Sequence, residues 1–482
     1  MLESLDISFS YDGKTQILRS ANLQIHPGEV VVLTGPTGSG KSTLAKCLSG
    51  FIPRSVSGEL SGEIRIDGEN TSDYSIAEIS RLVSLVQQDP DSQICTLKVI
   101  DEVAFGPENY EFSTETIEKI AESSLLAVDT LHLHNRNTHT LSGGEKQRLA
   151  IASMLSCQPK YLILDEPSAS LDPKGVLLLR KILAGLKDKN VGVLCIEHNL
   201  EAVRPVADCI LSISNGTIID WKPIAEQPIT PTAQSPVPDT PLLTLKNVNF
   251  SYGSTQVIHD ASLTIHQGEI IALMGGNGSG KTTLVSLLGG LLEPDNGRVD
   301  LGRVPISSGR DRKEIVKRIS VVFQNPNHQI FERTVWKEQI LTSEILNEIH
   351  EVSIQRSTDL LNSANLGNFL TRNPFSLSHG QKRRLNITSS IAHAPRILLL
   401  DEPFIGQDQD GREFISNIIV ETASANGAVL VVTHNPNFAK NYCNRVIFVE
   451  NGSILLDGLP ETVLQRLVEI GHSEYSDLGV NS

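Results

Sequence analysis

The sequence predicts an α/β protein built from two copies of one domain, each formed around a mostly parallel β-sheet. Two strings indicate the duplication: residues 35–43 (GPTGSGKST) recur at 275–283 (GGNGSGKTT), and residues 164–167 (LDEP) recur at 400–403. Within each copy, short apolar runs rich in β-forming residues alternate with helical patterns. This alternation is typical of a parallel sheet covered by helices.

The spacing of the two copies gives the domain organisation. Lys41 corresponds to Lys281 and Glu166 to Glu402, so the offset between the copies falls from 240 to 236 residues. Length alone, at roughly 150 residues per domain, would suggest about three domains. We instead expect one domain over 1–222, a linker over 223–241 and a second domain over 242–482. Six of the nineteen linker residues are Pro, which predicts an extended tether.

The composition excludes several classes of protein. The 482-residue chain has a formal charge of −15, 39% hydrophobic residues and 5% aromatic residues. The negative charge and the scarce aromatic side chains suit nucleic-acid binding poorly. No apolar run approaches the roughly 20 residues of a membrane helix, and the first residues lack the pattern of a signal peptide. The six Cys form no C-x-x-C pair, so we expect reduced thiols in a cytoplasmic protein.

The expected elements of the first copy follow from its apolar runs and glycines. A strand feeds the glycine string, a helix follows that string, and two further apolar strands come later in the copy. The expected strands are Glu29–Thr34, Tyr161–Leu164 and Val191–Ile196, and the expected helices are Lys41–Leu48 and the segment from Ser142 through Leu155.

Both glycine strings match G-x-x-x-x-G-K-[ST], which is typical of a phosphate-binding loop. Each lies between a strand and a helix, so backbone N–H groups and the helix N-terminus can surround a phosphate. We expect Lys41 and Lys281 to reach the β- and γ-phosphates, and the hydroxyls of Ser42 and Thr282 to hold Mg²⁺. The other candidate residues of these loops are Gly35, Gly38, Gly40, Thr43, Gly275, Gly278, Gly280 and Thr283.

An acidic pair ends an apolar strand in each copy. The first member, Asp165 or Asp401, suits the coordination shell of Mg²⁺. The second member, Glu166 or Glu402, can polarise an attacking water as a general base. A solvated pair of strand-end acids is the alternative, and the phosphate loop in the same domain argues against it.

A third motif, Ser142-Gly143-Gly144, opens a helix and offers a second anion-binding surface. The three motifs together resemble the nucleotide-binding domain of ATP-binding-cassette (ABC) proteins, in both copies. The resemblance implies an antiparallel β subdomain, a helical subdomain that carries the Ser-Gly-Gly signature, and ATP with Mg²⁺ as ligands. It also implies head-to-tail pairing of the copies, in which the signature of one completes the ATP site of the other.

The resemblance further assigns roles outside the three motifs. It implies that an aromatic residue stacks on adenine, a glutamine lies near metal and water, an aspartate faces the partner copy, and a histidine contacts the γ-phosphate. Each histidine follows an apolar strand, 32 residues beyond the glutamate of its copy. In the same order, the residues are Tyr11 and Tyr252, Gln88 and Gln324, Asp172 and Asp408, and His198 and His434.

A narrower resemblance rests on Q-x-P-x-x-Q, at 88–93 and 324–329, and on DEVAFGPEN at 101–109. These strings look like those of the ATPases of energy-coupling-factor (ECF) importers, which take up vitamins and transition-metal ions. The resemblance implies a peripheral motor on the cytoplasmic face of the membrane. Its implied partners are a transmembrane coupling subunit and a small substrate-binding membrane subunit, without nucleic acid. Residues 51–62 resemble the thiamine-precursor branch, while cobalt and nickel stay open.

The copies differ where phosphate must approach closely. The second signature reads Ser378-His379-Gly380, so a side chain replaces the first glycine. Residues 404–408 (FIGQD) also depart from 168–172 (SASLD). In the head-to-tail arrangement, the intact first signature completes the site on Lys281 and Glu402. We therefore expect this site to carry more of the hydrolysis.

Three other functions share some of these features. A soluble double-cassette factor acting on ribosomes shares the duplication, but such factors usually carry a long charged helical linker, whereas 223–241 is short and rich in Pro. A double-cassette sugar-importer ATPase usually loses the lysine of its second phosphate loop, and Lys281 is present. The two complete Lys/Asp/Glu/His sets argue against a non-catalytic regulatory module.

Overall fold

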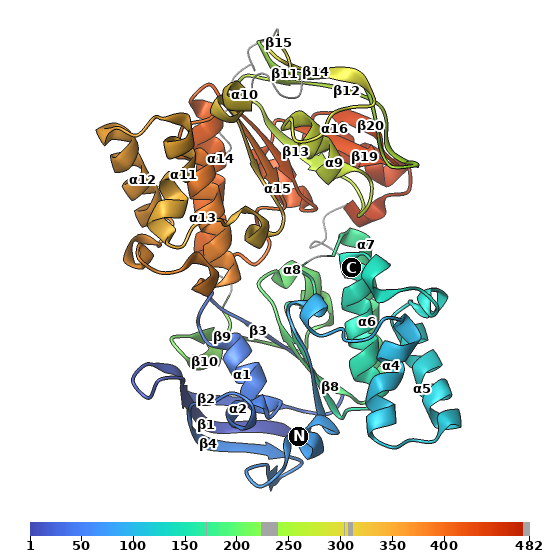
Figure 1. The fold of residues 1–482 in the computed structure, drawn as a ribbon. Coiled ribbons are helices and arrows are strands. Elements are labelled where there is room, and N and C mark those ends of the chain that lie inside the picture. Colours follow the sequence, from blue (N-terminus) through green and yellow to red (C-terminus); the bar gives the residue numbers. More distant parts are fainter. Residues whose placement is uncertain (170, 223–239, 303, 307–311, 476–482) are drawn as a thin grey trace. The chain divides into compact units, whose positions relative to one another are not determined.

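The computed structural model describes residues 1–482 except 170, 223–239, 303, 307–311 and 476–482. The chain divides into two compact units, Met1–Ile224 and Ala225–Ser482 (Figure 1). Most of the expected tether lies outside the described residues, and Pro241 already begins a strand of the second unit. Within the described ranges, no helix combines the length and the hydropathy that crossing a bilayer requires.

Each unit contains an antiparallel sheet and a mostly parallel sheet, which confirms the α/β prediction. In the first unit the antiparallel order is β2-β1-β4-β5, and the parallel sheet runs β10-β9-β3-β8-β7-β6 with an antiparallel β9–β10 pair. The strands are β1 (Leu2–Ser10), β2 (Gln16–Ile25), β3 (Val30–Thr34), β4 (Glu59–Ile66), β5 (Glu69–Asn70), β6 (Val83–Val86), β7 (Tyr161–Asp165), β8 (Gly192–Ile196), β9 (Cys209–Ser214) and β10 (Thr217–Asp220).

The helices of the first unit cover the parallel sheet and build a helical subdomain beside it, where α4 and α5 lie against α6 (Figure 1). The α-helices are α1 (Lys41–Leu48), α2 (Phe51–Arg54), α3 (Ile76–Ser80), α4 (Val99–Asn109), α5 (Thr114–Ala127), α6 (Gly143–Ser156), α7 (Pro173–Asp188) and α8 (Leu200–Val203). The 3₁₀ turns are η1 (Pro90–Ser92), η2 (Leu131–Leu133), η3 (Thr138–Thr140) and η4 (Arg204–Val206).

The central strand β3 is buried on both faces. Successive side chains of a strand point to opposite sides of the sheet, so its residues join two different cores. Val30 and Val32 join the core that includes α6 and α7, whereas Val31 and Leu33 join the core shared with α1 and the antiparallel sheet. The strand therefore stands between two cores, and the loop that follows it starts from a fixed point.

The second unit repeats this design, with the antiparallel order β12-β11-β14-β15 and the parallel order β16-β17-β18-β13-β19-β20. Its strands are β11 (Pro241–Tyr252), β12 (Thr255–His266), β13 (Ile270–Met274), β14 (Asn296–Leu301), β15 (Val304–Pro305), β16 (Ile319–Val322), β17 (Ile397–Asp401), β18 (Ala428–Val432), β19 (Arg445–Glu450) and β20 (Ser453–Gly458). Its α-helices are α9 (Lys281–Leu288), α10 (Arg312–Arg318), α11 (Val335–Leu346), α12 (Glu351–Ser363), α13 (His379–Ile391), α14 (Gln409–Ser424), α15 (Pro436–Tyr442) and α16 (Pro460–Glu469). Its 3₁₀ turns are η5 (Pro326–Gln329), η6 (Gly367–Phe369), η7 (Pro374–Ser376) and η8 (Ser473–Tyr475).

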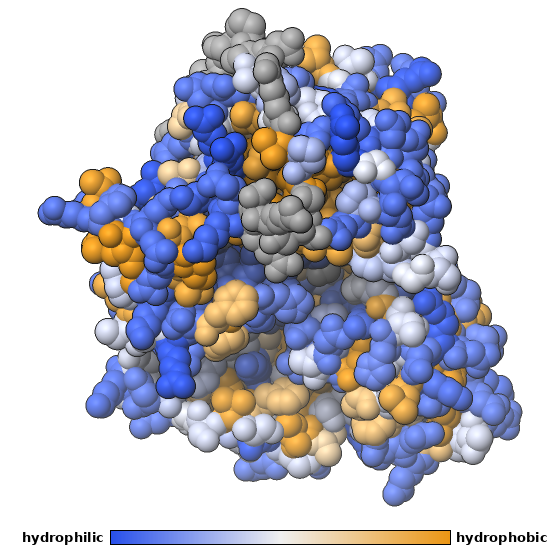
Figure 2. All heavy atoms as spheres, turned by 45° about the horizontal axis from the view of Figure 1, so that its top comes forward, coloured by the Kyte–Doolittle hydropathy of each residue, from blue (hydrophilic) through white to orange (hydrophobic). Residues whose placement is uncertain are grey.

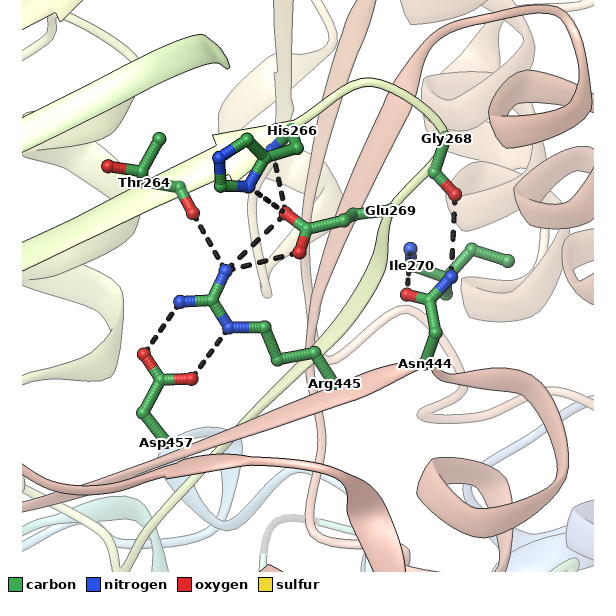
Figure 3. A network of polar contacts seen from close by, with 8 residues as sticks. All are labelled: Thr264, His266, Gly268, Glu269, Ile270, Asn444, Arg445 and Asp457. Carbon is green, nitrogen blue, oxygen red and sulfur yellow. Dashed lines mark hydrogen bonds and ion pairs between the residues drawn. The ribbon is translucent and has the colours of Figure 1, made fainter. Parts of the chain in front are cut away.

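A polar cluster fixes the start of β13 in the second unit (Figure 3). The guanidinium of Arg445 makes two bonds of 2.6 and 2.7 Å to the carboxylate of Asp457 and one of 3.1 Å to the carboxylate of Glu269. Asn444 accepts the backbone N–H that begins β13 at 2.8 Å. The strand that leads to the glycine loop is thus tied to β19 by side chains as well as by its ladder.

Candidate functional site

The predicted residues gather at one edge of each parallel sheet. In the first unit β3, β8, β7 and β6 are consecutive neighbours, and parallel pairing brings their carboxyl ends to the same edge. The glycine loop follows β3, the acidic pair ends β7, and Gln88 and His198 follow β6 and β8. Open α/β sheets bind ligands outside the carboxyl ends of their strands, so the topology favours a site here.

Both glycine loops have the backbone that a phosphate cradle needs. Gly35, Gly38 and Gly40 have φ of 147°, 81° and 106°, and the corresponding glycines of the second unit have φ of 148°, 77° and 103°. A Cβ at Gly35 would approach the carbonyl oxygen of Ile213 to 2.3 Å, whereas one at Gly38 would meet no atom within 4 Å. The first glycine therefore permits close packing, and the middle glycine leaves open space above the loop.

The lysines of the loops are buried at their expected places. Lys41 Nζ donates to the carbonyls of Gly35 and Pro36 at 2.8 and 2.9 Å, and Lys281 Nζ makes the equivalent pair of bonds at 2.8 Å each. The hydroxyls of Ser39 and Ser279 are buried and find no hydrogen-bond partner among the described residues. Unpaired buried hydroxyls cost free energy, so a ligand with acceptor oxygens fits both loops.

The first acid of each pair contacts the hydroxyl expected beside it. Thr282 Oγ1 donates to Asp401 Oδ2 at 2.8 Å, and Ser42 hydrogen-bonds the Asp165 carboxylate. Burial raises the pKa of Asp165 to about 6 and also raises the pKa of Asp401, against the opposing effect of the hydroxyls and of the nearby lysines. A bound cation would favour the charged form of both carboxyls.

The residues present suit Mg²⁺ in combination with a phosphate ligand. In the described part of the chain, no three or more His, Cys, Asp or Glu side chains are grouped as a metal site. Each loop instead offers one hydroxyl and one carboxylate, at the Thr282–Asp401 and Ser42–Asp165 pairs. Mg²⁺ usually takes one or two carboxylates and completes its shell with water and phosphate oxygens.

The glutamate, glutamine and histidine of the first unit form one cluster. Gln88 Nε2 donates to Glu166 Oε2 at 2.8 Å, and His198 Nε2 lies 3.3 Å from Glu166 Oε1. Glu166 has φ of 52°, a strained conformation for a residue with a side chain. The sharp turn after β7 aims the carboxylate between the two neighbouring strand ends.

The second unit keeps only part of this arrangement. His434 Nε2 lies 3.1 Å from Glu402 Oε1, and Glu402 has φ of 48°. The exposed side chain of Gln324 forms no hydrogen bond to Glu402 in the described structure. Burial, followed by the charge of Asp401, raises the pKa of Glu402. The two glutamines that the sequence treats as equivalent are therefore placed differently.

The last glutamine of each Q-x-P-x-x-Q string closes the loop on itself. Gln93 accepts the N–H of Gln87 at 3.0 Å and donates to the carbonyl of Leu85 at 3.2 Å. Gln329 makes the same two bonds in the second unit, at 2.9 and 2.7 Å. These residues shape the backbone that carries Gln88 and Gln324, so the string has a structural role in both units.

Both signature serines cap a helix. Ser142 caps α6 in a capping box with Glu145, and Ser378 caps α13 in a capping box with Gln381. The backbone N–H groups of Gly143 and Gly144, or of His379 and Gly380, follow the cap in the first helical turn, where anions bind favourably. Asp172 and Asp408 cap α7 and α14 by accepting the N–H groups of Gly175 and Gly411.

The changes around His379 fit one another. A Cβ at Gly406 would come within 3.0 Å of His379 Nδ1, so the missing side chain at Gly406 leaves room for the imidazole ring. Gln407 is buried and donates to the carbonyl of Gly380 at 3.2 Å. The altered signature and the altered loop before α14 form one packed unit.

Tyr11 and Tyr252 are half exposed, at 47% and 54%, as adenine stacking requires. Each packs edge to face against the phenylalanine two residues earlier in its strand, with ring centroids 4.7 and 4.9 Å apart. Tyr11 also hydrogen-bonds Thr43, the last residue of the first glycine string, at 3.1 Å.

Sequence reasoning missed two buried ionisable residues beside these sites. Glu197 precedes His198 and accepts the N–H of Ser168 at 2.8 Å, while Arg383 on α13 is fully buried behind the acidic pair of the second unit. Each stands opposite a different residue in the other copy, Thr433 and Gln147. A position-by-position comparison of the copies at the 236-residue offset would have found both.

Comparison with known proteins supports the resemblance to ATP-binding-cassette proteins. The family model described as ABC transporter matches residues 18–169 and 258–405. A protein of Saccharolobus solfataricus, provisionally named as an ABC transporter ATP-binding protein, is 32% identical over 98% of this chain and 96% of its own. A Bacillus subtilis protein, provisionally named as the HMP/thiamine import ATP-binding protein YkoD, is 30% identical over 96% of this chain and 92% of its own.

Solved structures share the fold. A model of ribosome-bound archaeal Pelota and ABCE1 superposes with a TM-score of 0.69 at 22% identity, covering 94% of this chain and 79% of the other. The RNase-L inhibitor superposes with a TM-score of 0.67 at 22% identity, covering 97% and 93%. At these identities the likeness concerns the fold alone. Since the family model matches more than half of the chain, once in each unit, the chain belongs to the ABC transporter family, as an ATPase with two ATP-binding cassettes.

Proposed function

We propose that this ATPase is the motor subunit of an ECF-type importer that takes up a vitamin, of the thiamine-precursor kind, or a transition-metal ion. The observation that carries the proposal is the 30% identity, over nearly the whole of both chains, with a relative named for HMP/thiamine import. The Q-x-P-x-x-Q strings and the string at 101–109 support it. The protein would act as a peripheral subunit on the cytoplasmic face of the membrane.

Exposed apolar side chains support contact with membrane partners. They follow the Q-x-P-x-x-Q string in each unit: Leu97 and Phe105 are 65% and 49% exposed in the first, and Phe331 and Ile345 are 73% and 56% exposed in the second. Figure 2 shows a hydrophobic group at the left edge of the molecule, where Figure 1 places α11 and α12. Because the two sets differ, we propose that the units bind different parts of the transmembrane coupling subunit and of the substrate-binding subunit.

The residues of each ATP site have different roles. Lys41 or Lys281 neutralises phosphate charge, and Glu166 or Glu402 takes the proton of the attacking water. Mg²⁺, when bound, would neutralise the charge that develops on the phosphates. Ser42 and Asp165, or Thr282 and Asp401, would hold the ion, with Gln88 or Gln324 close to it.

We also propose head-to-tail pairing of the two cassettes, which would complete the two ATP sites unequally. The site on Lys281, Glu402 and His434 would pair with the intact Ser142-Gly143-Gly144, whereas the site on Lys41, Glu166 and His198 would pair with the signature that contains His379. We propose that the Glu402 site hydrolyses more ATP. ATP binding would hold the lobes closed, and loss of the γ-phosphate contacts would let them reopen.

The alternative is a soluble double-cassette ATPase that acts on ribosomes. The structural likeness to ABCE1 concerns the fold, and the charge of −15 suits a ribosomal RNA surface poorly. Isolation of the tagged chain from its own cells tests the two functions against each other. Detergent-solubilised membranes and a ribosome-containing sucrose gradient are compared, each with and without ATP.

If the chain is the motor of an importer, we expect to recover it from membranes together with two integral membrane proteins, one of them small. The charge-introducing pair Leu97→Glu and Phe331→Glu would release these proteins while ATP hydrolysis by the purified chain persists. Co-sedimentation with ribosomes, in the absence of membrane proteins, would overturn the proposal and favour the alternative.

A further inference from the structure

Arg383 is a buried cation without a carboxylate in contact. It lies on α13, its side chain is fully buried, and its guanidinium donates to the backbone carbonyls of Phe323 and Gln324. Among the described residues no acid forms an ion pair with it. Burial lowers the pKa of Arg383 to about 10, and the nearby negative charges of Asp401 and Glu402 oppose this shift. Burying a charge is costly unless it is compensated, so these two carbonyls and the acidic pair together keep the guanidinium in place.

The contact exists in one unit only, because the residues differ. Gln147 occupies the position of Arg383 in the first unit, and its buried Nε2 has no hydrogen-bond partner among the described residues. Asn386 strengthens the contrast, because its Nδ2 donates to the carbonyl of Pro326 at 2.8 Å, whereas Ala150 stands at this position in the first unit. Helix α13 thus holds the backbone of the Gln324 loop at three carbonyls, those of residues 323, 324 and 326.

The side chains of Gln88 and Gln324 make different contacts in the two units. In the first unit, where α6 has no such arginine, Gln88 reaches the carboxylate of Glu166 at 2.8 Å. In the second unit the backbone at Gln324 is fixed to α13, and the exposed glutamine makes no described bond to Glu402. The backbone at Gln324 is therefore held by the helix that begins with the signature motif.

We propose that Arg383 is a positioning residue of the second ATP site, which fixes the loop carrying Gln324 to the signature helix α13. The proposal rests on the function proposed above for Glu402 and Gln324. It deepens that function by linking two parts of one cassette: any displacement of α13 moves Gln324 with it. The first cassette lacks these bonds to the loop backbone, and its signature helix α6 contacts the Gln88 loop through the side chains of Lys146 and Asp91.

The test uses the full chain with Glu166→Gln as the parent, so that hydrolysis reports the second site. Arg383→Gln introduces the residue of the first unit, and Arg383→Lys keeps the charge but offers a single donor group. Arg356→Gln is the matched control, because Arg356 also donates to a backbone carbonyl of the helical subdomain, that of Ile391 at 3.2 Å. Steady-state kcat and KM for ATP, and hydrogen–deuterium exchange of the 320–332 segment, are measured for each.

We expect Arg383→Gln to lower kcat about tenfold with KM changed less than twofold, a loss typical of a small misplacement of a catalytic group. Exchange over 320–332 should rise in this variant, Arg383→Lys should recover part of kcat, and Arg356→Gln should match the parent. An unchanged kcat, or equal losses in Arg383→Gln and Arg383→Lys together with faster exchange throughout the unit, would overturn the proposal. Failure of the glutamate assignment is seen separately, as ATP hydrolysis that survives in the Glu166→Gln, Glu402→Gln double variant.

Discussion

At the scale of single residues, the two copies differ at Glu197, a buried carboxyl of the first unit. It is 2% exposed, and burial raises its pKa to about 7, whereas Thr433 stands at the same place in the second unit. Because folding raises this pKa, the folded state keeps the carboxyl protonated between about pH 4.5, its usual pKa, and about pH 7. The bound proton therefore adds fully to the free energy of unfolding below about pH 4.5, and this contribution is lost as the pH rises through 7.

This shift predicts that Glu197→Gln stabilises the first unit at pH 8 but hardly at pH 5. The neutral amide still accepts the N–H of Ser168 and removes the cost of a buried charge, on the order of 1–3 kcal/mol. The chain has two Trp, Trp221 in the first unit and Trp336 in the second. Urea unfolding of the first unit can therefore be followed by fluorescence in a Trp336→Phe background. An equal gain at both pH values would contradict the assigned pKa.

At the scale of elements, the Arg445 cluster joins β12, β13, β19 and β20 of the second unit (Figure 3). Arg445 side-chain exposure is 20% and that of Glu269 is 8%, so the pair is shielded from much of the solvent screening that weakens surface ion pairs. The first unit has Cys209 at this position and lacks the corresponding guanidinium.

Replacement by the residue of the other copy tests the cluster. Arg445→Cys leaves Glu269 and Asp457 without their shared cation, and we expect a loss of about 2 kcal/mol from the second unit. Urea unfolding in a Trp221→Phe background follows this unit, and Arg466→Ala, which removes an exposed ion pair with Glu469, is the control. Equal effects of the two substitutions would show that the cluster contributes no more than a surface pair.

The elements that sequence predicts well are those whose motifs dictate backbone shape. Helix α1 matches its predicted bounds, and β3, β7 and β8 begin or end within one residue of theirs. The difference between Gln88 and Gln324 was not predictable from the strings, because both carry Q-x-P-x-x-Q. It arises from Arg383, which lies about 60 residues further along the chain and acts only once α13 packs against β16. Burial and long-range contacts of this kind leave no local pattern in a sequence.

For the whole molecule, two cassettes on one chain allow two unequal ATP sites. The glycine loops and acidic pairs are alike in both units, whereas the signatures, the loops before α7 and α14, and the contacts of the glutamine loops differ. A duplicated chain can vary one site while the other preserves hydrolysis. We infer that this asymmetry matches an asymmetric membrane partner.

The most direct test compares Glu166→Gln and Glu402→Gln for ATP hydrolysis by the chain assembled with the proposed membrane partners. Both substitutions remove one carboxylate and keep the size of the side chain. We expect Glu402→Gln to lower the rate of ATP hydrolysis about tenfold or more, and Glu166→Gln to leave the larger share of the activity. Equal losses, or a larger loss from Glu166→Gln, would contradict it.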